Sequence, residues 1–211
     1  VSDDGIRGVS VRLASNFDDI RLLNDDMIFC TAGTKLAKLC NFALENSLAG
    51  LEFAYGIPGT AGGAAYMNAG AYGGEIKDVL KTVQHITPDF IMETADAADL
   101  NLEYRKSFYS AHPEYIIATA EFKLQKGDKT EIKAKMDDLI GRRKDKQPLE
   151  FPSAGSVFKR PEGYFAGKLI QDCNLKGYTI GGAQVSNKHS GFIINIGDAT
   201  CQDVQALVAH I

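Results

Sequence analysis

Seven of the 21 glycines in this chain lie in one stretch, Gly56–Gly74, which reads GIPGTAGGAAYMNAGAYGG. The stretch shows neither helical periodicity nor strand alternation. Glycine lets the backbone adopt positive φ and lets another group approach closely, so successive amides can surround an anion. Pro58 and Thr60 add a fixed φ and a capping hydroxyl. The composition predicts either a phosphate-binding segment or a packed turn between closely apposed elements, and it leaves both open.

Two common phosphate-binding motifs are absent from this glycine segment. A Walker A loop ends in Gly-Lys-Ser/Thr, and a dinucleotide-binding loop reads Gly-x-Gly-x-x-Gly. Neither pattern occurs between Gly56 and Gly74. The segment is therefore neither a P-loop nor a Rossmann fingerprint.

Length and charge narrow the class of protein. The 211 residues are 45% hydrophobic and 24% charged, which is typical of a folded chain with one large domain or two small ones. The net charge of −4 argues against general nucleic-acid binding. No apolar run is long enough to span a membrane, and no signal peptide is visible, so we expect a cytoplasmic protein without membrane partners.

The cysteines and histidines show no metal-binding or redox spacing. We expect the cysteines to be buried free thiols in a reducing compartment, and we expect no metal site. The residues concerned are Cys30, Cys40, Cys173 and Cys201, with His85, His112, His189 and His210.

The hydrophobic pattern predicts an α+β chain in two lobes that divide near 125–127. Strands are expected over 8–13, 27–32, 80–86, 115–124 and 191–196. Helices are expected after an N-cap at Thr34, over 129–144, over 166–172, and after an N-cap at Thr200. The helix over 129–144 has a narrow apolar stripe made of Ile132, Met136, Leu139 and Ile140.

The glycine segment and three later blocks closely resemble the MurB family, the flavoenzymes known as UDP-N-acetylenolpyruvoylglucosamine reductases. The later blocks are Tyr104–Phe108, then Lys146–Pro148 leading to Ser153–Pro161, and Ala166–Asp172 with Gly181–Ser186. The blocks agree in order and spacing, and the resemblance covers essentially the whole chain. The short connection from Tyr109 to Tyr115 resembles the branch of the family that lacks a long tyrosine-loop insertion.

The resemblance implies a fold in two parts. Residues 1–125 would form an FAD-binding region of the FAD-linked reductase/oxidase (PCMH-like) type, with its first subdomain mostly missing. Residues 126–211 would form a smaller α+β substrate-binding domain that lacks its C-terminal end. The family's catalytic glutamate lies beyond the last helix and has no counterpart here, so we expect a chain truncated at both ends.

The resemblance also implies a reaction. NADPH, by way of FAD, would reduce UDP-N-acetylglucosamine enolpyruvate to UDP-N-acetylmuramate in peptidoglycan precursor synthesis for the cell wall. We expect a cytoplasmic monomer with a UDP-sugar enolpyruvyl ether as substrate. Such a reaction needs a cation beside the substrate carboxylate, on which negative charge develops. It also needs an acid near the carbon next to the terminal methylene of the enolpyruvyl ether, because that carbon takes up a proton.

Site residues are carried over from the matching blocks. The catalytic residues would be Arg105, which binds the substrate carboxylate, and Ser156, which donates the proton. FAD contacts would come from Gly56, Ile57, Pro58, Gly59, Thr60, Gly62, Gly63, Asn68 and Arg143. Substrate contacts would come from Lys146, Lys159, Arg160 and His189. For Arg143 and His189 an exposed surface position is the equal alternative, and Arg160 replaces an asparagine that is common in the family.

Two other functions compete with the reductase. One is a flavin- or nucleotide-binding module without catalysis. The other is a flavin oxidase of the wider superfamily, which would need a covalent flavin link through a His or Cys that no pattern here suggests.

Overall fold

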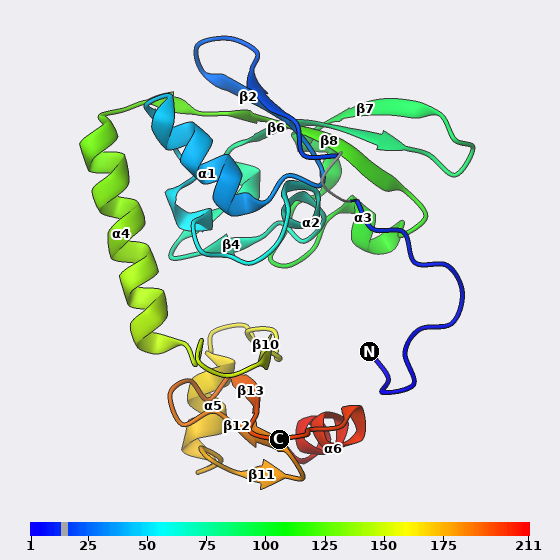
Figure 1. The fold of residues 1–211 in the computed structure, drawn as a ribbon, viewed down its shortest axis with the longest axis vertical. Coiled ribbons are helices and arrows are strands. Elements are labelled where there is room, and N and C mark those ends of the chain that lie inside the picture. Colours follow the sequence, from blue (N-terminus) through cyan, green and yellow to red (C-terminus); the bar gives the residue numbers. More distant parts are fainter. Residues whose placement is uncertain (14–16) are drawn as a thin grey trace. The chain divides into compact units, whose positions relative to one another are not determined.

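The computed structural model describes residues 1–13 and 17–211, which divide into two compact units (Figure 1). The large unit is Arg12–Gly141, and the small unit is Val1–Val11 with Arg142–Ile211. The division falls inside helix α4 (Lys129–Lys146), later than the predicted boundary between 125 and 126. The physical reason is that Ile132 and Met136 of α4 belong to the core of the large unit.

The large unit is built on a five-stranded sheet in the order β1-β2-β8-β6-β7, and all neighbouring strands are antiparallel. Its strands are β1 (Ile20–Leu22), β2 (Met27–Thr31), β6 (Leu80–Ile86), β7 (Met92–Asp96) and β8 (Ile116–Lys123). The alternation that predicted β2, β6 and β8 is confirmed. Side chains such as Val83, Ala120 and Phe122 are fully buried, because one face of the sheet is covered.

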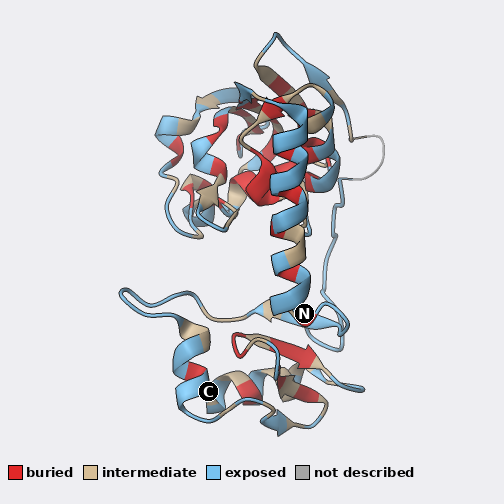
Figure 2. Ribbon diagram, turned by 90° about the vertical axis from the view of Figure 1, so that its left-hand side faces the viewer, coloured by how far each residue is buried: buried red, intermediate tan, exposed pale blue. Residues whose placement is uncertain are grey.

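Short helices and hairpins complete the large unit. The α-helices are α1 (Leu36–Glu45), α2 (Ala61–Tyr66) and α3 (Phe108–Ala111), and the 3-10 helices are η1 (Glu52–Ala54), η2 (Ile76–Asp78) and η3 (Ala97–Leu100). Two small antiparallel pairs are β3 (Leu48–Ala49) with β9 (Gln125–Lys126), and β4 (Gly70–Ala71) with β5 (Gly74–Glu75). Figure 2 shows buried residues on the sheet and on the inner sides of these helices.

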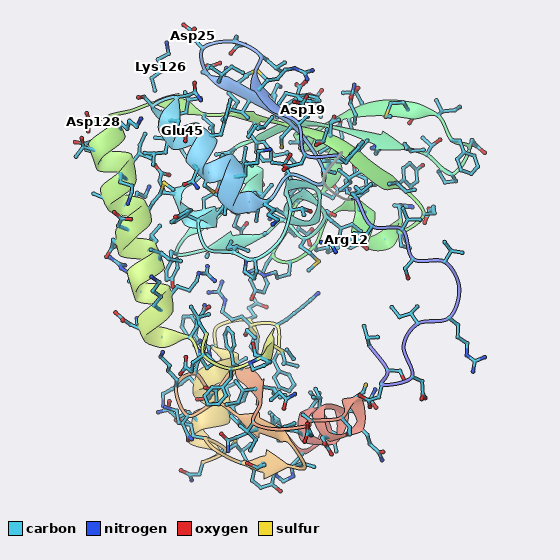
Figure 3. All side chains as sticks on the ribbon, viewed as in Figure 1. Arg12, Asp19, Asp25, Glu45, Lys126 and Asp128 are labelled. Carbon is cyan, nitrogen blue, oxygen red and sulfur yellow. The ribbon has the colours of Figure 1, made fainter. Side chains whose placement is uncertain are left out.

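Helix α4 begins where the sequence predicts. The Asp128 carboxylate, labelled in Figure 3, accepts the backbone N–H groups of Thr130 at 2.9 Å and Glu131 at 3.0 Å. A carboxylate at this position satisfies amides that have no partner inside the helix. Of the predicted apolar stripe, Ile132, Met136 and Leu139 are buried and Ile140 is partly buried. Just before α4, Lys126 pairs with Asp25 at 3.0 Å, also labelled in Figure 3.

The small unit has its own sheet and core. Its four strands run in the order β10-β13-β12-β11, all antiparallel. They are β10 (Ser153–Ser156), β11 (Thr179–Ile180), β12 (Ala183–Val185) and β13 (Phe192–Asn195), and the helices are α5 (Ala166–Asp172) and α6 (Cys201–His210). The core consists of Ile170, Ala183, Val185, Ile193 and Leu207. The predicted helix over 166–172 is confirmed at both ends.

One of the two predicted helix caps is confirmed, and the other is wrong. Thr200 caps α6, and its hydroxyl accepts the Asp203 N–H at 3.1 Å. Thr34 does not cap α1, since the N-cap is Lys35 without a side-chain bond. The Thr34 hydroxyl donates instead to the Asp19 carbonyl at 3.1 Å. That prediction was wrong because a contact from a distant part of the chain takes the hydroxyl.

Other expectations are corrected by the structure. The stretch 8–13 is expected to be a strand, but it pairs with no other described residue. The expectation of buried thiols holds for Cys30 and Cys40 and is wrong for Cys173, which is exposed, and for Cys201, which is partly exposed. The acidic stretch 93–102 contains most of β7 and all of η3, which the pattern did not predict.

Membrane-spanning helices and metal-ligand clusters are both absent from the described residues. Within 1–13 and 17–211, no helix is both long and apolar enough to cross a membrane. In the same ranges, no group of three or more His, Cys, Asp or Glu side chains is arranged to hold a metal ion.

Candidate active site

The glycines of the segment Gly56–Gly74 fall into two groups. The first group is needed for packing. A Cβ on Gly62 would lie 2.6 Å from the Ala32 Cβ, and one on Gly74 would lie 2.6 Å from the Phe53 ring. A Cβ on Gly70 would lie 2.7 Å from the Gly74 carbonyl oxygen. These distances are too short for any side chain, so part of the segment is the packed turn that the composition left open.

The second group of glycines faces open space. Nothing lies within 4 Å of a Cβ built on Gly59 or Gly73, and both have positive φ, of 146° and 90°. Gly63 is also exposed, on the first turn of α2. The backbone amides of Gly56, Gly59 and Thr60 donate to no acceptor in the described part of the chain. A ligand can therefore approach exposed backbone at Gly59 and find unbonded amides over Gly56–Thr60.

The remaining amides at the start of α2 are used within the protein. Ala61 donates to the Thr34 carbonyl at 2.8 Å, and Gly62 donates to the Ala32 carbonyl at 2.9 Å. Gly63 donates to the Thr60 hydroxyl at 3.3 Å, as expected for a capping threonine. The expectation that the whole row of amides faces a ligand is therefore too broad.

The loop between β2 and α1 lies directly beside the glycine segment, which the sequence reasoning missed. Its residues 32–35 accept the two bonds just described, and the Leu36 N–H donates back to the Gly59 carbonyl at 3.1 Å. Gly33 is in contact with the Phe17 carbonyl, since a Cβ there would lie 2.3 Å from that oxygen. The available signal was a small-residue run, Thr-Ala-Gly-Thr, directly after a buried strand.

Arg105 lies at the tip of a tight turn. Glu103 and Lys106 exchange both backbone bonds, at 3.1 and 3.2 Å, so that Tyr104 and Arg105 are the two central residues. The backbone of Arg105 is left-handed, with φ 54°. Its Nη2 donates to the Gly70 carbonyl at 2.7 Å, and its guanidinium lies 5.1 Å from the centre of the Tyr104 ring. The turn thus holds a partly buried cation against the β4–β5 hairpin.

Asn68 is fully buried, and each polar atom of its side-chain amide has a partner within the protein. Its Nδ2 donates to the Glu75 carboxylate at 3.1 Å and to the Glu103 carbonyl at 2.9 Å. Its Oδ1 accepts the Lys77 N–H at 2.9 Å. These bonds join the end of α2, the β4–β5 hairpin and the turn that carries Arg105.

Glu75 is an anion beside this cation. Burial acts to raise the pKa of its carboxyl. Hydrogen bonds from Lys77 and Asn68 outweigh that effect, and the positive charges of Lys77 and Arg105 add to them, so the pKa lies below its ordinary value. The site therefore contains an ionised glutamate that balances part of the positive charge.

Ser156 ends β10 in the small unit. The strand pairs with β13 through an irregular register between Ser153 and Ser156, and Gly155 has φ 75°. Ser156 is exposed, and its Oγ lies 3.3 Å from the place that a Cβ on Gly191 would occupy. The bulge thus directs a hydroxyl to the surface beside a glycine.

The His189 imidazole lies against the same glycine. Its Nδ1 accepts the Gly191 N–H at 3.1 Å and would lie 3.2 Å from a Gly191 Cβ. Its ring meets Phe192 edge to face at 4.9 Å. Burial lowers the pKa of this imidazole, so the ring is neutral near neutral pH with its proton on Nε2. His189 is therefore partly packed, and its contact to a ligand stays a prediction.

The chain matches family models over most of its length. Residues 147–211 match the C-terminal domain of UDP-N-acetylenolpyruvoylglucosamine reductase, and residues 1–92 match an FAD binding domain. Over 211 residues the chain is 50% identical to the UDP-N-acetylenolpyruvoylglucosamine reductase of Syntrophomonas wolfei and 53% identical to that of Listeria welshimeri. It covers 70% of each of these relatives. The chain belongs to the MurB family.

A solved MurB structure has the same fold. The enzyme from Thermus caldophilus superposes with a TM-score of 0.88 at 36% identity, over 100% of this chain and 76% of that one. The resemblance to the family, and the fold of an FAD-binding part followed by a smaller α+β lobe, are thereby confirmed. The match to an FAD binding domain confirms the predicted cofactor.

The other residues predicted from the MurB blocks are now placed. Arg143 is buried near the end of α4, where its Nη1 donates to the Gln147 side chain at 3.3 Å, so the alternative of an exposed helix face is wrong. Lys146 and Lys159 are exposed. Arg160 is exposed and lies 5.5 Å over the Phe165 ring. Their contacts to cofactor or substrate stay predictions.

The MurB block Gly181–Ser186 has a structural explanation. A Cβ on Gly181 would lie 2.3 Å from the Asp203 carboxylate carbon, and one on Gly182 would lie 2.1 Å from the Gly197 carbonyl oxygen. Helix α6 therefore starts directly on this pair of glycines. The block is required for packing, whatever it contributes to a ligand.

Proposed function

We propose that this chain carries out the FAD-dependent, NADPH-driven reduction of UDP-N-acetylglucosamine enolpyruvate to UDP-N-acetylmuramate in peptidoglycan precursor synthesis. The observation that carries the proposal is the 50% identity, over all 211 residues, to a relative named for this reductase. The residues proposed for chemistry, Arg105 and Ser156, lie within that match.

The glycine segment fits the cofactor. FAD presents a pyrophosphate, and three backbone amides at Gly56, Gly59 and Thr60 have no acceptor in the described part of the chain. No atom lies within 4 Å of a Cβ built on Gly59, so an anion has room beside this residue. We assign FAD contacts to Gly56, Gly59, Thr60 and Gly63, with Ile57 and Pro58 shaping the bend. Gly62 supports the same surface by letting α2 approach Ala32 closely.

The chain's own groups match the charge that the reaction develops. Bound FAD supplies the hydride that NADPH delivers to the site. Arg105 holds the substrate carboxylate while negative charge builds on it, because its fork has N–H donors beyond the one that meets Gly70. The hydride goes to the terminal methylene carbon of the enolpyruvyl ether. Ser156 gives its hydroxyl proton to the carbon next to that methylene, and the serine then recovers a proton from solvent.

Further substrate contacts belong to the same proposal. Lys146, Lys159 and Arg160 offer exposed positive charge for a UDP diphosphate, and His189 offers an Nε2–H donor. Arg143 is the proposed basic contact to the cofactor. The monomeric state and the cytoplasmic location stay predictions.

The two half-reactions test the proposal separately. The purified protein should take up FAD, lose its visible flavin absorbance with NADPH, and regain it on addition of the enolpyruvyl substrate. A protein that binds FAD but never regains absorbance would be the non-catalytic flavin-binding module instead. A protein that binds no FAD refutes both functions.

Ser156→Ala sharpens this test. The rate of absorbance recovery should fall by about 10²–10⁴-fold, the usual contribution of a general acid, while bleaching by NADPH is unchanged. Ser10→Ala, which removes the hydroxyl of another exposed serine of the small unit, is the control and should recover normally. Equal loss of both half-reactions in Ser156→Ala would contradict the role of proton donor.

A further inference from the structure

The bonds of Asn68 point toward Arg105 rather than toward a ligand. Both N–H groups and the oxygen of its amide already have partners in the large unit, and the side chain is fully buried. Both donors are therefore used inside the protein, and a completely buried side chain is not exposed to a cofactor. Two of its three partners, Glu103 and Glu75, lie in the turn of Arg105 and in the hairpin that receives the Arg105 guanidinium, and the third, Lys77, lies in η2 directly after that hairpin.

The Glu103 carbonyl is the key acceptor. It closes the turn by accepting the Lys106 N–H at 3.2 Å, and it also accepts the Asn68 Nδ2 at 2.9 Å. The turn holds Arg105 in a left-handed conformation that is unfavourable for a residue with a Cβ. A bond from a buried group to the closing carbonyl opposes the opening of such a turn.

The second N–H of Asn68 fixes the other side of the same arrangement. It donates to Glu75, which pairs across the hairpin with Gly70. The Gly70 carbonyl in turn accepts Arg105 Nη2 at 2.7 Å. One buried amide therefore connects the backbone that carries Arg105 to the strand that orients its guanidinium.

We propose that Asn68 is a positioning residue that clamps the Arg105 turn, and that it acts on substrate reduction through Arg105 and not through contact with FAD. This inference rests on the proposed function of Arg105. It replaces the expectation that Asn68 binds the cofactor.

The position of Asn68 allows a clean test. Asn68 follows α2 with φ 40°, and the next amide, of Ala69, donates to the Ala64 carbonyl at 2.9 Å, the pattern of a helix that ends in a left-handed residue. Glycine is the preferred residue there. Asn68→Gly therefore keeps the helix end and removes the two clamp bonds together with the acceptor for the Lys77 N–H. Asn68→Asp keeps the size and the acceptor for Lys77 and removes both donors.

The matched control is Asn174→Gly. Asn174 also follows a helix, α5, with φ 57°, but it is exposed and lies in the small unit. In the FAD-loaded protein, both Asn68 variants should lower the rate at which substrate restores the flavin absorbance by about 10- to 100-fold, because the catalytic group is then misplaced. FAD affinity and bleaching by NADPH should stay at the wild-type level in both, and Asn174→Gly should match wild type throughout.

A double-mutant cycle completes the test. In the Arg105→Ala background, Asn68→Gly should not slow recovery further, because two residues that act through one contact are not additive. Additive losses, or a loss of FAD affinity in the Asn68 variants with normal recovery, overturn the inference. If Arg105→Ala restores flavin absorbance slowly while the Asn68 variants restore it at the wild-type rate, the clamp alone is overturned. If Arg105→Ala restores flavin absorbance at the wild-type rate, the proposed role of Arg105 itself is refuted.

Discussion

At the scale of single residues, Arg105 has a left-handed backbone conformation that is unfavourable for arginine. Half of the described non-glycine residues with positive φ are asparagine or aspartate, namely Asn68, Asn101, Asn174 and Asp198. These types tolerate the left-handed region, whereas arginine does not. A strained residue that persists at a cation site is typical of a functional position.

Substitutions of Arg105 should therefore separate stability from activity. Arg105→Gly relieves about 1–2 kcal/mol of backbone strain, which offsets the lost contacts, so the melting temperature should change little. Arg105→Ala keeps the strain and should be the less stable of the two. Flavin recovery by substrate should fall about 10²–10³-fold in both, as for loss of a charge-stabilising donor. A fast Arg105→Gly protein would contradict the assignment.

The thiols differ from one another at the same scale. Burial raises the pKa of Cys30 and of Cys40 to about 12, while Cys173 is exposed. Thiolate is the reactive form, so Cys173 should react quickly with iodoacetamide at neutral pH, and Cys30 and Cys40 should react only on unfolding. Mass spectrometry of labelled peptides measures this. Rapid labelling of Cys40 would mean that α1 opens readily.

At the scale of elements, two adjacent glycines of α2 play different roles. Gly62→Ala should destabilise the protein by about 1–3 kcal/mol, because the new Cβ overlaps Ala32. Gly63→Ala meets only the Thr60 hydroxyl, at 3.6 Å, so it should be neutral or stabilising by up to about 1 kcal/mol. If FAD lies over this exposed turn, Gly63→Ala weakens FAD binding in a stable protein. Urea unfolding and flavin titration distinguish the two effects.

The stability of helix α6 should depend on pH in the acid range. Backbone N–H groups of Thr200 and Gly182 donate to Asp203 and lower the pKa of its carboxyl. A lowered pKa in the folded state adds stability above the unfolded pKa, and this stability is lost as pH falls through the folded value. Asp203→Asn should therefore weaken the small unit at neutral pH and flatten its acid dependence. Asp198→Asn, on the neighbouring exposed loop, is the control, and equal acid profiles for both variants would contradict this cap.

At the scale of the whole molecule, the two units have cores made of different residues. Leu207 in α6 and Leu39 in α1 are both completely buried, one in each core. Either leucine changed to alanine should cost about 2–5 kcal/mol. Hydrogen exchange should then rise in β12 and β13 for Leu207→Ala, and in β2 and β8 for Leu39→Ala. Increased exchange in both units from one substitution would show that they unfold together.

Local patterns predicted the elements that local physics dominates. Strand β6 and helix α5 occur with the predicted ends, because their alternation and helical period are uninterrupted. Strand β7 was missed because its residues are nearly all exposed, so pairing with β6 and not hydrophobicity makes it a strand. Thr34 was misjudged because its hydroxyl bonds to Asp19, fifteen residues earlier.

The family, the cofactor and the residues that merit testing can be recognised from the amino-acid sequence alone, because short blocks of fixed spacing are visible without any fold. The use of each of those residues becomes visible only in the folded chain. Gly62 packs on Ala32 while Gly59 stays bare, and Asn68 reaches Glu103 across the chain. Such roles depend on neighbours that are distant in sequence, and contacts of that kind exist only after the chain has folded.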